Sequence, residues 1–192
     1  MPKKPEVRRI TDSRVLAAMA HPLRRRLVDL LKVEGPATAS VLAERTGEAI
    51  GNISHHMKVL AASELVEEAP ELARDRRERW WRLVSSALRW SVRDFADDPA
   101  GEAVALAAAS LGLDRQLELL NAWRAASPDV HAAWAEGPFS TDSWLRLSPD
   151  ELARFSQELI GLIRSWADRD IPEDGVERDP VFVFAHGFPA QP

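Results

Sequence analysis

The stretch Gly35–Val66 reads GPATASVLAERTGEAIGNISHHMKVLAASELV and decides how the first half of the chain folds. Pro36 and Thr38 precede a first apolar helical pattern, and Thr38 is the expected N-cap because its hydroxyl can accept a hydrogen bond from the first turn. Gly47 follows the pattern as the expected left-handed C-terminal residue, since glycine tolerates positive φ. The stretch therefore begins with a helix of about two and a half turns.

A second helix is expected from about Ala49 to Ala62. Its apolar residues recur at spacings of three and four, which places them on one face. They are Ile50, Ile53, Met57 and Leu60. The opposite side collects Gly51, Asn52, His55 and Lys58, with Ser54 and His56 at its margins. Two helices joined by so short a turn form a helix-turn-helix, whose second helix can enter the DNA major groove. A helical hairpin inside an ordinary core would give the same local pattern.

Segments on either side make the pattern more specific. LAAMAHPLRRRLVDLL at Leu16–Leu31, SHHMKVL at Ser54–Leu60 and RERWWR at Arg77–Arg82 accompany GPATASVLAERTG in a fixed order. From about Thr11 to Val84 the chain resembles the ArsR-type winged-helix transcriptional regulators, through its HPLR start of one helix and its S-x-H-[LM]-x-x-L recognition helix. The resemblance implies a winged helix-turn-helix that binds double-stranded DNA as a homodimer.

On this interpretation the DNA contacts come from the helix-turn-helix and from the loop that forms the wing. The residues expected to contact DNA are Thr38, Asn52, Ser54, His55, His56, Lys58, Arg74, Arg76 and Arg77. Side chains of the second helix would contact base edges and phosphates, and the three arginines would reach phosphates or a narrow minor groove. A solvated, charged hairpin tip is the alternative interpretation of the arginines.

The wing is predicted from two strands, Leu65–Ala69 and Glu78–Val84, joined by Pro70–Arg77. Alternation along the second strand places Trp80 and Trp81 on opposite sides. Proteins that bind duplex DNA seldom expose bases for stacking, so at least one of these rings is expected to pack in the core.

One residue departs from the family pattern in a way that predicts backbone strain. Glu64 stands where relatives usually have glycine, before the first wing strand. A non-glycine residue with positive φ there would be strained by about 1 kcal/mol.

Composition limits the functional classes. The chain has 192 residues and is 45% hydrophobic, enough for one or two compact domains. It contains no cysteine, which excludes disulfides, thiolate chemistry and cysteine metal sites. We find no signal-peptide pattern and no apolar run long enough to span a membrane, so a cytoplasmic protein without membrane partners is expected.

Metal binding and catalysis find little support in the sequence. The adjacent His55 and His56 would point about 100° apart on a helix, and no cysteine or carboxylate cluster completes a metal site. No catalytic or nucleotide-binding motif is present. We therefore expect neither an enzyme nor a bound cofactor or metal.

The net charge of −5 hides an uneven distribution. Residues 1–90 hold 17 Lys and Arg against 12 Asp and Glu, whereas residues 91–192 hold 8 against 18. The first part is thus expected to face a polyanion and the second a copy of itself or a small molecule. A chance split, with solvated charges on both halves, is the alternative.

The N-terminal part is expected to begin with a flexible basic arm over residues 1–11. Two helices should follow, one over Asp12–Ala20 and one from Pro22 to about Val33. Three consecutive arginines in the second of these cannot all point one way, so one or two are expected at phosphates or acidic neighbours. They are Arg24, Arg25 and Arg26.

The second half is predicted to be mainly helical, with one or two short strands. Expected helices follow Ser85, Gly101, Ser127 and Ser148, and expected strands lie at Trp144–Leu147 and, buried, at Val181–Phe188. The helix over about Gly101–Ala126 carries a face of leucines suited to dimerisation, with a break allowed at Gly112. Its leucines are Leu106, Leu113, Leu117 and Leu120.

Aromatic residues and histidines gather in this second half and could line a pocket for an apolar or aromatic effector. The candidate residues are Trp123, His131, Trp134, Trp144, Phe155 and His186. An ordinary core would use the same residues.

These observations predict a mostly α (α+β) chain. A winged helix-turn-helix domain over residues 12–84 precedes a mainly helical dimerisation and effector-binding region over residues 85–192. The function predicted is that of a homodimeric transcriptional repressor that binds a roughly palindromic operator, and a winged-helix module for protein–protein interaction is the alternative.

Overall fold

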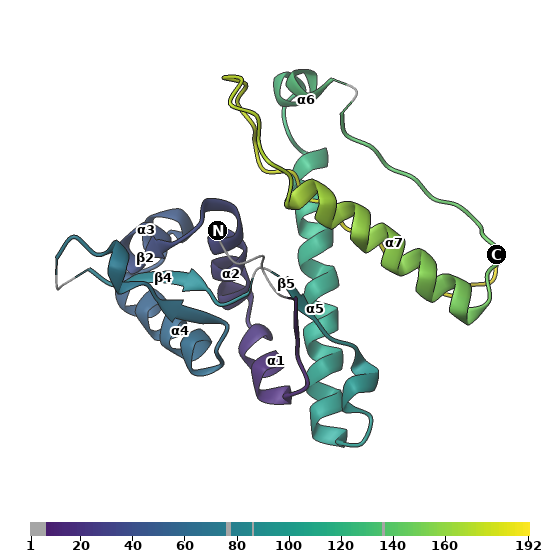
Figure 1. The fold of residues 1–192 in the computed structure, drawn as a ribbon, viewed down its shortest axis with the longest axis horizontal. Coiled ribbons are helices and arrows are strands. Elements are labelled where there is room, and N and C mark those ends of the chain that lie inside the picture. The colour runs from purple at the N-terminus through teal and green to yellow at the C-terminus, as the bar shows by residue number, and fades with distance from the viewer. Residues whose placement is uncertain (1–6, 76–77, 86, 136) are drawn as a thin grey trace. The chain divides into compact units, whose positions relative to one another are not determined.

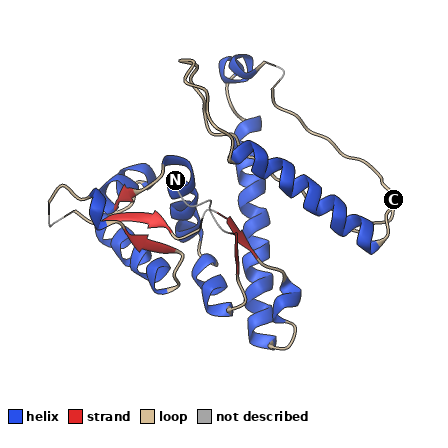
Figure 2. Ribbon diagram, in the orientation of Figure 1, coloured by secondary structure: helices blue, strands red, loops and turns tan. Residues whose placement is uncertain are grey.

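The computed structural model describes residues 7–75, 78–85, 87–135 and 137–192. It is mostly helical with short strands, as predicted (Figure 2). The chain divides into two compact units, Met1–Glu118 and Leu119–Pro192. No helix in the described ranges has both the length and the apolar character needed to cross a membrane. The division into residues 12–84 and 85–192 stays a prediction.

Four helices form the first part of the N-terminal unit (Figure 1). They are α1 (Ser13–Met19), α2 (Pro22–Glu34), α3 (Ala39–Thr46) and α4 (Ile50–Ala62). The Asp12 side chain caps α1 by accepting a hydrogen bond from the Arg14 amide, and Pro22 opens α2 at a position where no intrahelical donor is needed. The predicted helices are confirmed to within one or two residues.

A three-stranded antiparallel sheet flanks these helices, in the order β2–β4–β3. Its strands are β2 (Ala37–Thr38), β4 (Trp80–Leu83) and β3 (Val66–Glu68). The two wing strands are confirmed, and a short 3-10 helix, η1 (Pro70–Leu72), follows the first of them. The sequence did not predict β2, because two residues are too few for an alternating pattern.

A second, parallel pairing joins the start of the chain to the segment after the wing. The strand β1 (Val7–Arg9) pairs with β5 (Ala87–Arg89). The prediction of a flexible arm is therefore wrong for residues 7–10, while residues 1–6 lie outside the described ranges. The helix expected after Ser85 is wrong as well: β5 is followed only by a 3-10 turn, η2 (Val92–Phe95).

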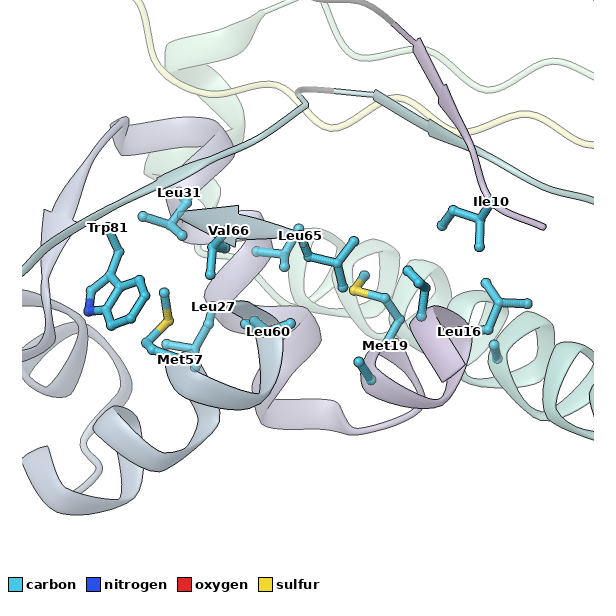
Figure 3. Close-up of a cluster of buried hydrophobic side chains, with 14 of the residues drawn as sticks. Ile10, Leu16, Met19, Leu27, Leu31, Met57, Leu60, Leu65, Val66 and Trp81 are labelled. Atoms are coloured by element: carbon cyan, nitrogen blue, oxygen red, sulfur yellow. The ribbon is translucent and has the colours of Figure 1, made fainter. Parts of the chain in front are cut away.

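The core of the N-terminal unit gathers apolar side chains from α1, α2, α4 and the sheet (Figure 3). Leu16, Leu27, Ile53 and Leu60 are fully buried, and Trp81 is 4% exposed. The expectation that one of the paired tryptophans packs inward is thus confirmed for Trp81. On α4 the predicted apolar face is buried at Met57 as well. Ile50, which begins the helix and was predicted on the same face, is 53% exposed and does not join the core.

The long helix α5 (Pro99–Arg124) continues through Gly112 without a break. Its small residues Gly101, Ala105, Ala108 and Gly112 are buried. Three leucines on its opposite side stay largely exposed, at 55% for Leu106 and 44% for both Leu113 and Leu117. The helix therefore has one face packed within the unit and one apolar face open.

The C-terminal unit contains the end of α5, then α6 (Pro128–Trp134) and α7 (Pro149–Ala167). A capping box formed by Ser148 and Glu151 starts α7, as the sequence predicts. The predicted strands at 144–147 and 181–188 are wrong: both segments lack regular structure, and Trp144 is 69% exposed. No described residue of 119–192 is buried, so this unit has no core of its own.

Candidate nucleic-acid interface

A tight turn between α3 and α4 builds the helix-turn-helix. The Thr38 hydroxyl accepts a hydrogen bond from the Val41 amide at 3.3 Å and so caps α3, as predicted. Gly47 ends the helix with φ of 75°, and its amide donates to the Ala43 carbonyl at 2.9 Å. Because positive φ is tolerated by glycine, the chain can reverse direction here and begin α4 three residues later.

The three consecutive arginines of α2 serve the fold. Arg24 donates to the carbonyls of Ala18 and Ala17 and so caps the end of α1. Arg26 donates to the carbonyls of Arg45 at 3.0 Å and Thr46 at 3.3 Å, which caps the end of α3. Helix C-terminal carbonyls hold both side chains, and the prediction placed only one or two of the three arginines at phosphates or acidic neighbours.

The third arginine of the run packs against α5. The guanidinium of Arg25 lies so close to Gly112 that a methyl group there would approach Arg25 Nη2 to 3.2 Å. Burial lowers the pKa of Arg25, and Asp29 acts in the opposite direction. Arg115 lies 3.6 Å from the same Asp29 carboxylate. This arginine therefore meets an acidic neighbour, as one alternative of the prediction allowed.

The polar side of α4 presents three of the predicted DNA contacts to solvent. Asn52, His55 and Lys58 are exposed, and Ser54 is half-buried beside them. Asn52 Nδ2 donates to Glu48 Oε2 at 2.9 Å in the free protein. This bond uses one of the two N–H groups of the amide, so the other N–H and Oδ1 can still contact a base.

His56 lies in the interior, although the sequence placed it at the margin of the polar side. Its side chain is 7% exposed, and its ring centroid lies 4.6 Å from that of His21 and 5.4 Å from that of His55. Burial lowers the pKa of both His21 and His56. The structure thus removes His56 from the exposed surface on which we expected it to contact DNA.

At the wing, a carboxylate positions the backbone of the predicted contact Arg74. Glu78 Oε2 accepts hydrogen bonds from the Arg74 amide at 3.0 Å and from Trp80 Nε1 at 3.2 Å. The Arg74 side chain itself is exposed. Arg76 and Arg77 lie outside the described residues.

The wing strands are nearly balanced in charge. Arg82 Nε donates to Glu67 at 2.7 Å, and a second nitrogen of the same guanidinium donates to Glu71. These partners, Glu67 first, raise the pKa of Arg82. Arg79 lies 3.6 Å from Glu68. Of the arginines described in the wing, Arg74 is therefore the one best placed for an outside anion.

The predicted effector pocket is only partly assembled. His131 Nε2 donates to the Trp123 carbonyl at 2.8 Å, and the two rings lie 4.5 Å apart. Trp134 is half-buried, whereas Trp144, Phe155 and His186 are exposed. None of these side chains is buried, as for every described residue of the C-terminal unit.

Histidine and carboxylate side chains can also bind metal ions where several of them gather. Within residues 7–75, 78–85, 87–135 and 137–192, no three His, Asp or Glu side chains gather closely enough to hold a metal ion.

An ion pair at the base of the wing was missed by the sequence analysis. Glu64 has φ of 53°, which confirms the predicted positive φ. Arg8 donates to the Glu64 carbonyl, and its other nitrogen donates to Glu64 Oε2 at 3.1 Å. Only the pairing of β1 with β5 brings these two residues together, so no local pattern could have found the contact.

Comparison with solved structures finds several proteins with partial likeness to this chain, among them ZitR, NMB1585 and Tm0710. ZitR from Lactococcus lactis is 14% identical, with a TM-score of 0.34 over 77% of this chain and 83% of that one. NMB1585, a MarR family regulator from Neisseria meningitidis, is 19% identical, with a TM-score of 0.30 over 75% of this chain and 74% of that one. The transcriptional regulator Tm0710 from Thermotoga maritima is 15% identical, with a TM-score of 0.32 over 78% of this chain and 80% of that one. A search of curated protein sequences finds no match.

A family model gives the more specific result. The model described as a helix-turn-helix domain matches residues 19–69, from the end of α1 to the residue after β3. This segment holds α2, α3, the turn at Gly47 and α4, which are the elements positioned by the contacts described above. The match agrees with the helix-turn-helix that the resemblance to ArsR-type regulators led us to expect in this part of the chain. Residues 19–69 of this chain are a helix-turn-helix domain of the type found in DNA-binding transcriptional regulators.

Proposed function

We propose that the protein is a cytoplasmic, homodimeric repressor that binds double-stranded DNA at a specific, roughly palindromic operator. The observation that carries this proposal is the exposed polar face of α4, where Asn52, His55 and Lys58 project from a helix whose other face is buried. An α-helix with such a face fits the major groove, and Arg74 of the adjoining wing can contact the phosphate backbone of the DNA.

The proposed contacts divide by chemistry. Asn52 suits an adenine edge, because its amide can donate and accept at the same time. Lys58 and Arg74 are suited to phosphates, which fix the register without reading sequence. Thr38, Ser54 and His55 complete the proposed contact surface, and Arg76 and Arg77, which lie outside the described residues, stay contacts predicted from the sequence. His56 is left out because its ring is buried.

Two features support a dimer. One is the open leucine face of α5, and the other is the C-terminal unit, whose described residues include no buried side chain. A second copy could cover both surfaces, since exposed apolar patches of this kind mark interaction sites. A two-fold dimer would place two α4 helices in successive major grooves about 34 Å apart, which is why the operator should be palindromic.

The proposal also includes regulation of the repressor by a small-molecule ligand. An apolar or aromatic effector would bind among Trp123, His131 and Trp134 where a second copy completes the enclosure. It would act by changing the spacing of the two α4 helices. A coupling free energy of about 1–3 kcal/mol would change operator affinity roughly 5- to 150-fold.

Salt titration of duplex binding tests the proposal. Genomic fragments would be selected with the purified protein, and the affinity for the best fragment measured over a range of salt concentrations. Each phosphate neutralised should contribute a log–log slope of about −0.9. If no fragment is preferred even at low salt, the proposal is wrong. The alternative, a winged-helix module for protein–protein interaction, is then favoured.

Two variants test which residues make the contacts. Lys58→Ala and Arg74→Ala should each weaken binding to operator and to unrelated duplex alike, and each should reduce the salt slope by about one unit. Arg178→Ala is the matched control, because Arg178 pairs with Asp174 in the C-terminal unit. Unchanged affinity in both test variants would contradict the assignment.

A further inference from the structure

A half-buried histidine, His21, meets a buried one, His56, at the junction between α2 and the recognition helix. His21 occupies the N-cap position of α2, and His56 lies in the middle of α4. Their ring centroids are 4.6 Å apart and the ring planes are inclined by 46°. The Nδ1 atoms of both rings are buried without a hydrogen-bond partner among the described residues. Unpartnered buried polar atoms are uncommon in folded proteins, so this pair calls for an explanation.

The surroundings of the pair oppose a positive charge. Arg24 acts on both histidines, and its guanidinium cannot move away easily because it is bonded to the carbonyls that end α1. His21 also stands at the positive end of the α2 dipole. His55 adds a third imidazole next to His56, whereas Glu48 acts in the opposite direction. The Glu48 carboxylate is already engaged by Asn52.

From this geometry we propose that the His21–His56 pair is a positioning element that seats α4 against α2 only while both imidazoles are neutral, so that mild acid loosens the recognition helix and weakens DNA binding. The DNA-binding half of this statement rests on the function proposed above. A proton added to either Nδ1 would place a charge in the interior with no acceptor and with a second imidazole in contact.

The direction of the pH effect follows from linkage. Burial is the first cause that lowers the pKa of each histidine in the folded protein, and Arg24 adds to it. The unfolded chain, in which histidine titrates near pH 6.5, therefore binds protons first as the pH falls. The stabilisation from the neutral pair is fully present above about pH 6.5 and is lost below it. As the pH falls through that range, proton uptake by each histidine of the unfolded chain lowers the ratio of folded to unfolded protein by up to about tenfold per pH unit.

Titration of the wild-type chain by NMR is the first test. The chain has five histidines, and the spectra of His21→Gln and His56→Gln identify the two signals of interest. We expect both signals to titrate with midpoints below about 6.5, and the amide signals of α4 to move with the same midpoints. Midpoints at or above about 6.5 for both histidines would overturn the proposal.

Unfolding in urea is the second test, made without DNA at about pH 7.5 and about pH 5.5. The wild type should lose more stability on acidification than His56→Gln does. The matched control is His131→Gln, which removes a histidine of the C-terminal unit and should keep the wild-type loss. If His56→Gln does not fold, His21→Gln removes the other half of the pair. Equal losses in the wild type and in the folded pair variant would contradict the proposal.

Operator binding at the same two pH values completes the experiment. The ratio of wild-type affinity to His56→Gln affinity should fall by up to about tenfold per pH unit below about pH 6.5. A constant ratio, with duplex bound at both pH values, would show that the pair does not control α4. If no duplex is bound at either pH, the proposed function fails, while the NMR and urea measurements still decide whether the pair seats α4.

Discussion

Glu64 connects the recognition helix to the first wing strand with a backbone angle that glycine would adopt more easily. Its φ of 53° lies in the left-handed region, where a Cβ crowds the backbone. The compensating contact is the bond from Arg8 to the Glu64 carbonyl, together with an ion pair to a side chain that is 79% exposed. Exposed ion pairs contribute little, so the strain is only partly offset.

Replacing Glu64 by glycine should therefore stabilise the protein. We expect Glu64→Gly to raise the free energy of unfolding by about 0.5–1 kcal/mol, because removing the Cβ relieves the strain by more than the lost ion pair costs. Urea unfolding at neutral pH measures the change. Glu67→Gly is the control, since it places glycine inside β3 and should destabilise. A destabilised Glu64→Gly would show that the contact with Arg8 matters more than the strain.

At single positions, the sequence was informative where the cause is local. The cap at Thr38 follows from neighbours in the chain, and the burial of one ring in the pair Trp80–Trp81 follows from strand alternation. The positive φ at Glu64 was expected from the family pattern, in which glycine usually stands there. His56 could not be placed in the same way. It stands at the margin of the polar face of α4, and its burial depends on His21, which only the packing of α2 brings into contact.

Among the elements, α3 depends most on contacts outside itself. It has only eight residues, too few for a helix that is stable alone. Its C-terminal carbonyls are satisfied by the Gly47 amide, by the Thr46 hydroxyl and by the guanidinium of Arg26 from α2. Arg26 thus sets the position of α3 relative to α2, and with it the geometry of the helix-turn-helix.

The variant Arg26→Gln should lower the free energy of unfolding by about 1 kcal/mol, as expected for the loss of a helix cap made by a charged donor. Hydrogen exchange should become faster in the last turn of α3 and stay unchanged in α1. Arg14→Gln is the control, because that side chain is exposed and pairs only with Asp12 among the described residues. Equal exchange rates in α3 before and after the change would contradict a capping role for Arg26.

Element prediction failed where strands are short or lie outside a hydrophobic pattern. The strands β1 and β5 have three residues each and are separated in sequence by most of the N-terminal unit. The formation of each strand therefore depends on a partner that local sequence does not specify. The opposite error occurred at 181–188. Its alternating aromatic and β-branched residues favour a strand, but no neighbouring strand is present in the described chain to pair with it.

For the whole molecule, the two units differ in how they are stabilised. The N-terminal unit has a continuous core, and its helix-turn-helix was predictable because helix periodicity, caps and turn chemistry all agree. Among the described residues, the C-terminal unit holds 16 of the 24 exposed large hydrophobic side chains. A unit of this composition needs a partner surface to bury apolar area, which a single sequence cannot specify.

Self-association should therefore depend on apolar residues that lie open in one chain. We expect Leu113→Glu on α5 to shift a dimer towards monomer by at least about tenfold in dissociation constant, since a buried charge at an interface costs more than 1.4 kcal/mol. Analytical ultracentrifugation measures the shift. The adjacent Asp114→Ala is the control, because Asp114 is a polar residue outside the leucine face. A variant that dimerises like the wild type would place the interface elsewhere.

The parallel pairing of β1 with β5 has a consequence for the order in which the chain folds during synthesis. Val7 is made early but pairs with Ala87, so β1 must wait for the whole helix-turn-helix and wing to emerge. At about 5–20 residues per second, the delay is roughly 4–16 s. Ile10, which ends 2% exposed, spends that interval in contact with water. The nascent helix-turn-helix can thus form first, and the beginning of the chain is then added to it as one of the last parts of the unit.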